Sequence, residues 1–176
     1  DSIWGLLDAE NARIEYADEA LHMELFTESW MAWTTPDDEV YENVHMEVTA
    51  DNNDGESTTE FGIVCYQQED GTSFYYAVIT PNGDYAIVLA ADGENDIFLT
   101  NDDQWATSNL IENKDSYRLG MDCGYGTLSL YVDGQLIDSV DDDTYDSGTS
   151  GVVVLSGEDV SSADVSFDDF LMTTLP

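Results

Sequence analysis

The stretch Phe61–Leu89 constrains the fold more than any other part of the chain. It contains three runs rich in β-branched and aromatic residues, separated by two turn signals at residues 68–72 and 81–84. The second turn contains Asn82-Gly83, and Asn-Gly between apolar runs favours a tight hairpin because both residues tolerate positive φ angles. Three consecutive antiparallel strands form a meander, and a meander this apolar needs a second sheet to cover it.

Further short runs that are typical of strands follow one another along the rest of the chain. Residues 44–50 alternate most clearly, with Met46 and Val48 directed inward and His45 and Glu47 outward. The other candidate strands span residues 12–26, 29–35, 97–99, 116–123, 128–133, 136–140, 151–156 and 163–172. About eleven or twelve short strands with almost no helical periodicity predict an all-β, two-sheet antiparallel β-sandwich.

The length of 176 residues is consistent with one domain. We expect residues 13–176 to form this single β-sandwich. Residues 1–12 form an N-terminal arm whose apolar residues Trp4, Leu6 and Leu7 dock on the body or on a neighbouring subunit.

The charge of the chain restricts its partners. It has 39 acidic residues against 3 basic ones, Arg13, Lys114 and Arg118, and a formal net charge of −36. These carboxylates must be spread over the surface, screened by salt, or neutralised by bound cations, and solubility in high salt alone would also account for them. Nucleic acid and anionic membrane surfaces are excluded as partners because both are bound through clustered Lys and Arg. No run of about 18 apolar residues occurs, so membrane insertion is not expected.

The start of the chain and its two cysteines suggest an extracellular protein. The sequence begins at Asp1 without a leader, which fits a secreted, mature product, although a boundary chosen within a longer chain would look the same. Cys65 and Cys123 each fall in an expected strand and are either two buried thiols or a disulfide. We favour the disulfide because an acidic all-β chain suggests an oxidising exterior. It would close a loop of 57 residues, and a loop of this size contributes about 4 kcal/mol of stability.

The order of the motifs resembles that of a known family. The strand Gly-x-x-Cys-Tyr at residues 62–66, the hairpin Leu-x-Leu-Tyr-Val-Asp-Gly at residues 128–134 and Phe-Asp-Asp-Phe at residues 167–170 carry the resemblance. Together they resemble the concanavalin A-like lectin/glucanase jelly roll, in its laminin-G-like or 3-keto-disaccharide-hydrolase-like secreted bacterial form. The resemblance implies two curved antiparallel sheets, an extracellular location, a module that binds or assembles, and often a structural calcium.

No catalytic motif accompanies the resemblance. Retaining glucanases on this fold carry Glu-x-Asp-x-x-Glu, which this sequence lacks, and Glu94-Asn95-Asp96 is the nearest approach. His22 and His45 occupy outward strand positions without a recognisable ligand spacing. Neither a Gly-x-Ser-x-Gly elbow nor a phosphate-binding glycine loop occurs. We therefore predict no catalytic residue and no organic cofactor.

Calcium is the cofactor that the acidic loops favour. Ca²⁺ takes six to eight oxygen ligands, and three stretches supply carboxylates densely, although each could equally be a solvated turn. The candidate ligands are Asp168, Asp169, Asp51, Asn53, Asp54, Asp142 and Asp146. Asp168 and Asp169 come first because acidic residues on the closing strand of this family tie the chain ends together. Alternation predicts that one of the two points outward and the other towards the core or the rim between the sheets.

Exposed aromatic rings are the other candidate ligand-binding groups, because they stack on the apolar faces of sugars. The candidates are Trp105, Tyr75 and Tyr125. Trp105 lies in a polar run and is expected to be the most exposed. Tyr75 and Tyr76 are adjacent on a strand, so one is expected in the core and the other on the surface.

These features together predict a non-catalytic extracellular protein with a structural or adhesive role at the cell surface. It would be stabilised by calcium and would assemble with other copies of itself or with cell-surface components. A carbohydrate-binding, lectin-like module that contacts polysaccharide is the first alternative. A glycoside hydrolase with an unfamiliar carboxylate pair is the second.

Overall fold

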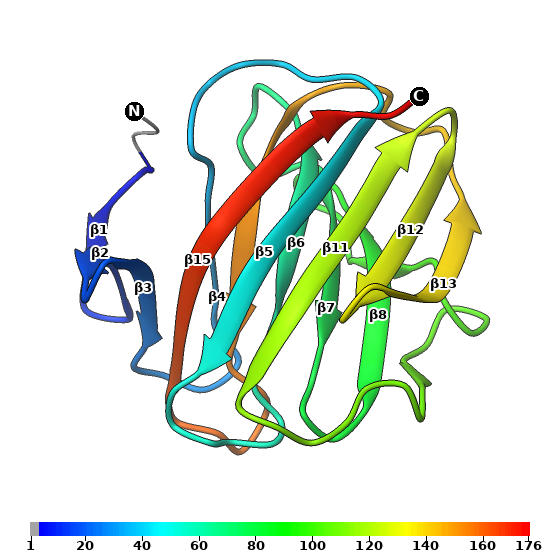
Figure 1. Ribbon diagram of the computed structural model, residues 1–176. Coiled ribbons are helices and arrows are strands. Elements are labelled where there is room, and N and C mark those ends of the chain that lie inside the picture. The colour runs from blue at the N-terminus through cyan, green and yellow to red at the C-terminus, as the bar shows by residue number, and fades with distance from the viewer. Residues whose placement is uncertain (1–3) are drawn as a thin grey trace.

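The computed structural model describes residues 4–176, in which all regular structure is β-strand. Two antiparallel sheets face each other as a sandwich (Figure 1). The front sheet has the order β1 (Leu7–Asp8), β2 (Ala12–Ala17), β3 (Ala20–Leu25), β15 (Ala163–Thr174), β5 (Val44–Asn52), β11 (Ser116–Gly124), β12 (Thr127–Val132) and β13 (Gln135–Asp141). The back sheet has the order β10 (Ala106–Thr107), β8 (Asp84–Ala90), β7 (Phe74–Ile79), β6 (Glu60–Gln67), β14 (Thr149–Leu155) and β4 (Met31–Thr34), with β9 (Ile97–Phe98) paired to β8. The predicted all-β jelly roll is confirmed.

The expected meander forms the centre of the back sheet as β6, β7 and β8. Its inward side chains, including Phe61, Tyr75 and Ile87, pack with Met46 and Leu119 of the front sheet in one core. All of these side chains are buried, because each inner face covers the other.

A second, smaller apolar cluster covers the outer face of the back sheet. Phe74, Tyr76 and Val88 belong to it, and the partly buried Phe98 and Trp105 pack over them. Tyr75 and Tyr76 are therefore both buried, so the expectation that one of them is exposed is wrong. The strand alternation is as predicted, but residues 91–107 fold over the face that would otherwise meet water.

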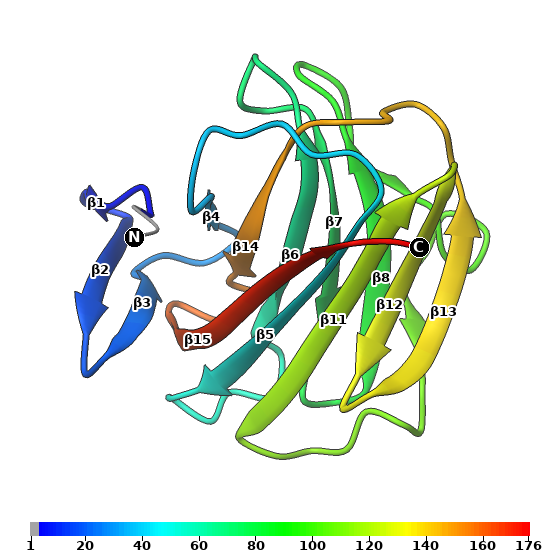
Figure 2. The same cartoon turned by 45° about the horizontal axis from the view of Figure 1, so that its top comes forward.

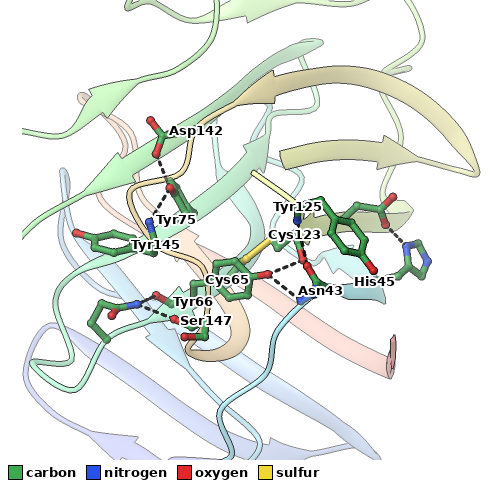
Figure 3. The surroundings of a disulfide bond; sticks show 12 residues. Asn43, His45, Cys65, Tyr66, Tyr75, Cys123, Tyr125, Asp142, Tyr145 and Ser147 are labelled. Carbon is green, nitrogen blue, oxygen red and sulfur yellow. Dashed lines mark hydrogen bonds and ion pairs between the residues drawn. A yellow bond between two sulfur atoms is a disulfide. The ribbon is translucent and has the colours of Figure 1, made fainter. Parts of the chain in front are cut away.

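The predicted disulfide is present. Cys65 of β6 and Cys123 of β11 are bonded and join the two sheets through the core (Figure 3). Beside it, the Tyr66 hydroxyl donates to the Cys123 carbonyl at 2.7 Å and accepts from the Asn43 backbone N–H at 3.0 Å. The same region therefore carries both a covalent and a hydrogen-bonded connection between the sheets.

The first expected strand, residues 12–26, is instead the hairpin β2–β3. Asp18 and Glu19 form its turn with φ angles of 51° and 68°. Two consecutive residues with positive φ are typical of a type I′ turn. The sequence did not reveal it, because neither residue is Gly or Asn. The hairpin aligns Glu15 with His22 across the two strands.

The described part of the N-terminal arm supplies the edge strand β1 of the front sheet. Leu7 and Asp8 pair with β2, and Trp4 packs edge-on against Phe170 with ring centroids 5.1 Å apart. Figure 2 shows β1, β2 and β3 at one side of the sandwich. Residues 1–3 of the predicted arm lie outside the described residues, and docking on a neighbouring subunit stays a prediction.

A β-bulge interrupts β15 between Asp168 and Leu171. Asp169 has a φ of 51°, and both Asp168 and Asp169 are exposed. The prediction that one of the two faces inward is therefore wrong, because the bulge breaks the period-2 alternation at this point.

Candidate functional site

The outer face of the front sheet carries a cluster of polar side chains where β5, β11 and β12 lie side by side. Along β5, Met46 and Val48 are buried whereas His45 and Glu47 face outward, as the alternation predicted. Antiparallel pairing places Asp122 of β11 opposite His45. The cluster therefore rests on paired strands rather than on loops, which fixes the positions of its side chains.

The surface is hollowed at this cluster. A cavity of about 370 Å³ is lined by His45, Glu47, Arg118, Leu119, Gly120, Asp122, Tyr131 and Gly134. Gly120 lies between Glu47 on β5 and Tyr131 on β12, and a Cβ atom there would approach the Tyr131 Cβ to 3.2 Å. The absence of a side chain at this position leaves the floor of the cavity open.

His45 is held at both ring nitrogens. Its Nδ1 lies 2.5 Å from Asp122 Oδ1 and its Nε2 lies 2.9 Å from Glu47 Oε1. The other oxygen of Asp122 accepts a hydrogen bond from the Tyr131 hydroxyl at 3.1 Å. A continuous chain of hydrogen bonds therefore runs from Glu47 through His45 and Asp122 to Tyr131.

Arg118 completes the cluster. Its Nε and Nη2 each lie 3.1 Å from Glu47 Oε2, and its Nη1 donates to Thr49 Oγ1 at 3.2 Å and to the Asp169 carbonyl at 2.9 Å. The bulge in β15 thus supplies a backbone acceptor for Arg118. One of the three permanent cations of this very acidic chain is placed here.

The protonation states follow from these contacts. Burial alone would lower the pKa of His45, but its hydrogen bonds to Glu47 and Asp122 outweigh that effect and raise the pKa above its usual range. The hydrogen bond from His45, supported by Arg118, lowers the pKa of Glu47. Burial and the contact with Asp122 raise the pKa of Tyr131. When His45 is protonated, its imidazolium and the Arg118 guanidinium face the carboxylate groups of Glu47 and Asp122.

The predicted calcium ligands are spread over the molecule. Asp168 and Asp169 lie on β15, Asp51, Asn53 and Asp54 lie at and after the end of β5, and Asp142 and Asp146 follow β13. None of these carboxylates belongs to a group of three Asp, Glu, His or Cys ligand atoms lying within 4.8 Å of one another in residues 4–176. A calcium site among them stays a prediction.

The predicted sugar-stacking residues have different environments. Trp105 is partly buried against Phe98, with ring centroids 5.8 Å apart, so the expectation that it is the most exposed ring is wrong. Tyr75 is fully buried and donates its hydroxyl to Asp142, so its ring is not available for stacking. Tyr125 is 70% exposed.

Tyr125 lines a second hollow of about 190 Å³, and Figure 3 shows its side chain near the disulfide. Asp142 and Asp146 also line it. Residues predicted separately as cation and glycan ligands therefore meet there. The nearest approach to a glucanase motif, Glu94-Asn95-Asp96, lies in the loop between β8 and β9, where Asp96 accepts a hydrogen bond from Tyr76.

The sequence prediction missed the main cluster. Glu47, Arg118, Asp122 and Tyr131 were not selected, and His45 was noted only as an outward residue. The available signal was the polar residues at alternate positions of residues 44–50 and 116–123. Only the pairing of β5 with β11 shows that these two runs share one surface.

Comparisons with solved structures identify the fold. The carbohydrate-binding module CBM66 from Bacillus subtilis superposes with a TM-score of 0.75 at 13% identity, over 97% of this chain and 95% of that one. A Bacillus licheniformis β-glucanase gives 0.64 at 12% identity over 98% and 92%. Sheep galectin-11, in complex with glycerol, gives 0.55 at 9% identity over 83% and 98%. No family model matches the chain, and no curated protein matches its sequence.

This chain has the concanavalin A-like jelly-roll fold, as the sequence motifs implied. At such low identity the likeness establishes the fold alone. Among residues 4–176 no helix could cross a membrane.

Proposed function

We propose that the protein is a carbohydrate-binding module whose ligand occupies the cavity on the front sheet. The observation that carries the proposal is the hydrogen-bonded cluster of His45, Glu47, Asp122, Arg118 and Tyr131 on rigid strands around a hollow of about 370 Å³. A concave site with a few convergent polar groups is typical of small-ligand binding. The similarity to a carbohydrate-binding module over nearly the whole chain supports this function better than the structural or adhesive one.

The chemistry of the cavity favours a neutral sugar. Carboxylate, guanidinium and phenol groups provide both acceptors and donors for neighbouring hydroxyls, and Tyr131 adds part of a ring face. The net charge of −36 opposes the approach of polyanionic polysaccharides. A neutral polysaccharide is therefore the proposed ligand class.

The disulfide and the fold support an extracellular location. Calcium stabilisation and self-assembly remain predictions from the sequence. Cleavage of the bound glycan is the second candidate function, because the chain from His45 through Asp122 to Tyr131 links groups capable of acid–base chemistry.

Calorimetric titration against neutral and uronic polysaccharides tests the proposal. We expect saturable binding of a neutral polysaccharide, without release of reducing ends or unsaturated products. Asp122→Asn should weaken it about tenfold or more, because hydrogen bonds to charged groups contribute about 1.5–3 kcal/mol. Asp102→Asn is the matched control, since Asp102 is an exposed carboxylate in the loop after β9.

Equal binding by wild type and Asp122→Asn would contradict the proposed site. Loss of binding in Tyr125→Ala alone would instead assign the ligand to the second hollow, which Tyr125 lines. If cleavage products form and their formation requires His45, the protein would be an enzyme rather than a binding module.

A further inference from the structure

A second polar cluster lies on the outer face of the front sheet, around the other histidine. His22 of β3 lies opposite Glu15 of β2, and Glu24 follows two residues later on the same face of β3. Asp164 of β15 lies opposite Glu24 on the other side. Three strands therefore bring three carboxylates to one imidazole. The sequence around His22 shows no recognisable ligand spacing, because Glu15 and Asp164 come from other strands.

Three of these residues have the geometry of a metal-binding set. One ring nitrogen of His22 and one carboxylate oxygen each from Glu15 and Glu24 lie within 4.8 Å of one another. In residues 4–176 no other group of three Asp, Glu, His or Cys ligand atoms is this compact. Glu15 is exposed and the other two are half-buried, so an ion can enter from solvent.

The imidazole is held in position by Asp164. Its Nε2 lies 2.5 Å from Asp164 Oδ1, and the same oxygen accepts a hydrogen bond from Asn53 Nδ2 at 2.8 Å. Within residues 4–176, Nδ1 of His22 makes no hydrogen bond. Histidines that bind metals usually donate their second N–H to a carboxylate, which fixes the tautomer and the ring orientation.

The charge around His22 is strongly negative. Burial raises the pKa of Asp54, and the nearby charge of Asp164 adds to this effect. In the described part of the chain, Arg13 is the one Lys or Arg with an ion pair to the cluster: its Nη1 lies 3.5 Å from Glu24 Oε2, and its Nε lies 3.7 Å from Asp8 Oδ1. A single shared guanidinium leaves an excess of carboxylate charge, which a divalent cation would reduce.

We propose that Glu15, His22 and Glu24 bind one divalent transition-metal ion of the zinc type, with Asp164 positioning the imidazole. An imidazole combined with carboxylates suits Zn²⁺ and its neighbours, whereas Ca²⁺ and Mg²⁺ prefer oxygen ligands alone. None of the three proposed ligands is among the calcium ligands predicted from the sequence, and none lines the glycan cavity.

Titration of the whole chain with Zn²⁺ in excess Mg²⁺ tests the proposal, because Mg²⁺ occupies diffuse acidic sites. We expect one saturable Zn²⁺ per chain by calorimetry. The chain has two histidines, so their ring nitrogen resonances can be followed individually by NMR. Zn²⁺ should shift the resonances of His22 and leave those of His45 unchanged.

Variants separate a specific site from general attraction to an acidic protein. Glu15→Gln should weaken Zn²⁺ binding about tenfold or more, whereas Glu158→Gln, with the same loss of charge in an exposed loop, should not. Asp164→Asn should weaken it by about tenfold, as is usual for groups that orient a ligand. Arg13→Gln should strengthen binding, because it removes the cation that competes for Glu24.

Two results would overturn the proposal. One is an equal loss of Zn²⁺ affinity in Glu15→Gln and Glu158→Gln, which would indicate diffuse attraction. The other is an unchanged His22 resonance at saturating Zn²⁺, which would exclude the imidazole as a ligand. Thermal melting of each variant without metal shows whether the fold is retained, and Arg13→Gln tests the site without removing any ligand.

Discussion

The two histidine clusters on the front sheet begin from the same local sequence and acquire different chemistry. His22 and His45 each open a His-Met-Glu tripeptide in which the methionine is buried and the other two residues face outward. Around His45, Asp122 of β11 bonds to one ring nitrogen and Glu47 to the other, and Arg118 of β11 offsets the charge of Glu47. Around His22, β2 and β15 supply the carboxylates Glu15 and Asp164, and the one guanidinium, that of Arg13 on β2, pairs with both Glu24 and Asp8, so carboxylates are in excess. The neighbouring strands, rather than the tripeptide, decide whether the surface suits a sugar or a cation.

The disulfide distinguishes the two clusters most strongly. Cys123 is the residue next to Asp122 on β11, whereas no disulfide lies in the strands around His22. Replacing both cysteines by serine should lower the free energy of unfolding by about 4 kcal/mol, measured by denaturant titration. Glycan affinity should fall more than Zn²⁺ affinity. Equal losses of both affinities would show that the disulfide supports the whole sheet rather than the His45 cluster.

Glu60 on the back sheet must be accounted for before the pH dependence of either cluster is interpreted. Burial raises its pKa from 4.5 to about 7. Folding therefore favours the neutral form of Glu60. The protonated carboxyl contributes fully to stability below about pH 4.5, and this contribution is lost as the pH rises through about 7. Glu60→Gln should therefore stabilise the protein at about pH 8 by at most about 3 kcal/mol. The free energy of unfolding of the wild type and of Glu60→Gln, measured across this pH range, checks the prediction. Equal slopes of this free energy against pH would contradict it.

Arg118 offsets the charge of Glu47 in the His45 cluster. Arg118→Gln should lower the free energy of unfolding by about 1 kcal/mol, a small value because the side chain is partly exposed. It should also raise the pKa of Glu47, since the guanidinium helps to lower it. Carboxylate NMR titration measures that shift. Lys114→Gln is the matched control, because Lys114 pairs with Asp133 and not with Glu47.

The smallest expected effect on stability comes from the protonation of His45. Its pKa is raised in the folded state, so its stabilising contribution is present below the unfolded pKa of about 6.5 and is lost as the pH rises through the folded pKa. In a Glu60→Gln background, His45→Gln should destabilise the protein in mildly acidic solution and have less effect at about pH 8. A constant difference between the two proteins across this range would show that His45 does not bind its proton more tightly on folding.

The sequence predicted the features that depend on residues close together in the chain. The meander follows from its apolar runs and from Asn82-Gly83, and the outward positions of His45 and Glu47 follow from strict alternation in residues 44–50. The disulfide follows from two strand cysteines in an acidic all-β chain.

The missed features depend on contacts between distant segments or on local backbone irregularities. Asp122 and Arg118 join His45 only because β11 pairs with β5 in one particular register. The hairpin at Asp18 lacks the usual turn residues, and the bulge at Asp169 breaks the alternation of β15. Trp105 lies in a polar run, yet a long-range apolar contact partly buries it.

Because residues 91–107 pack over the back sheet, the outer faces of the two sheets differ in character. Phe98 and Trp105 pack over apolar side chains on the outer face of the back sheet, whereas the outer face of the front sheet carries the polar clusters around His22 and His45. An extended ligand is therefore expected to lie against the outer face of the front sheet rather than that of the back sheet. Anything attached near β9 and β10 would be carried on the side that points away from the bound surface.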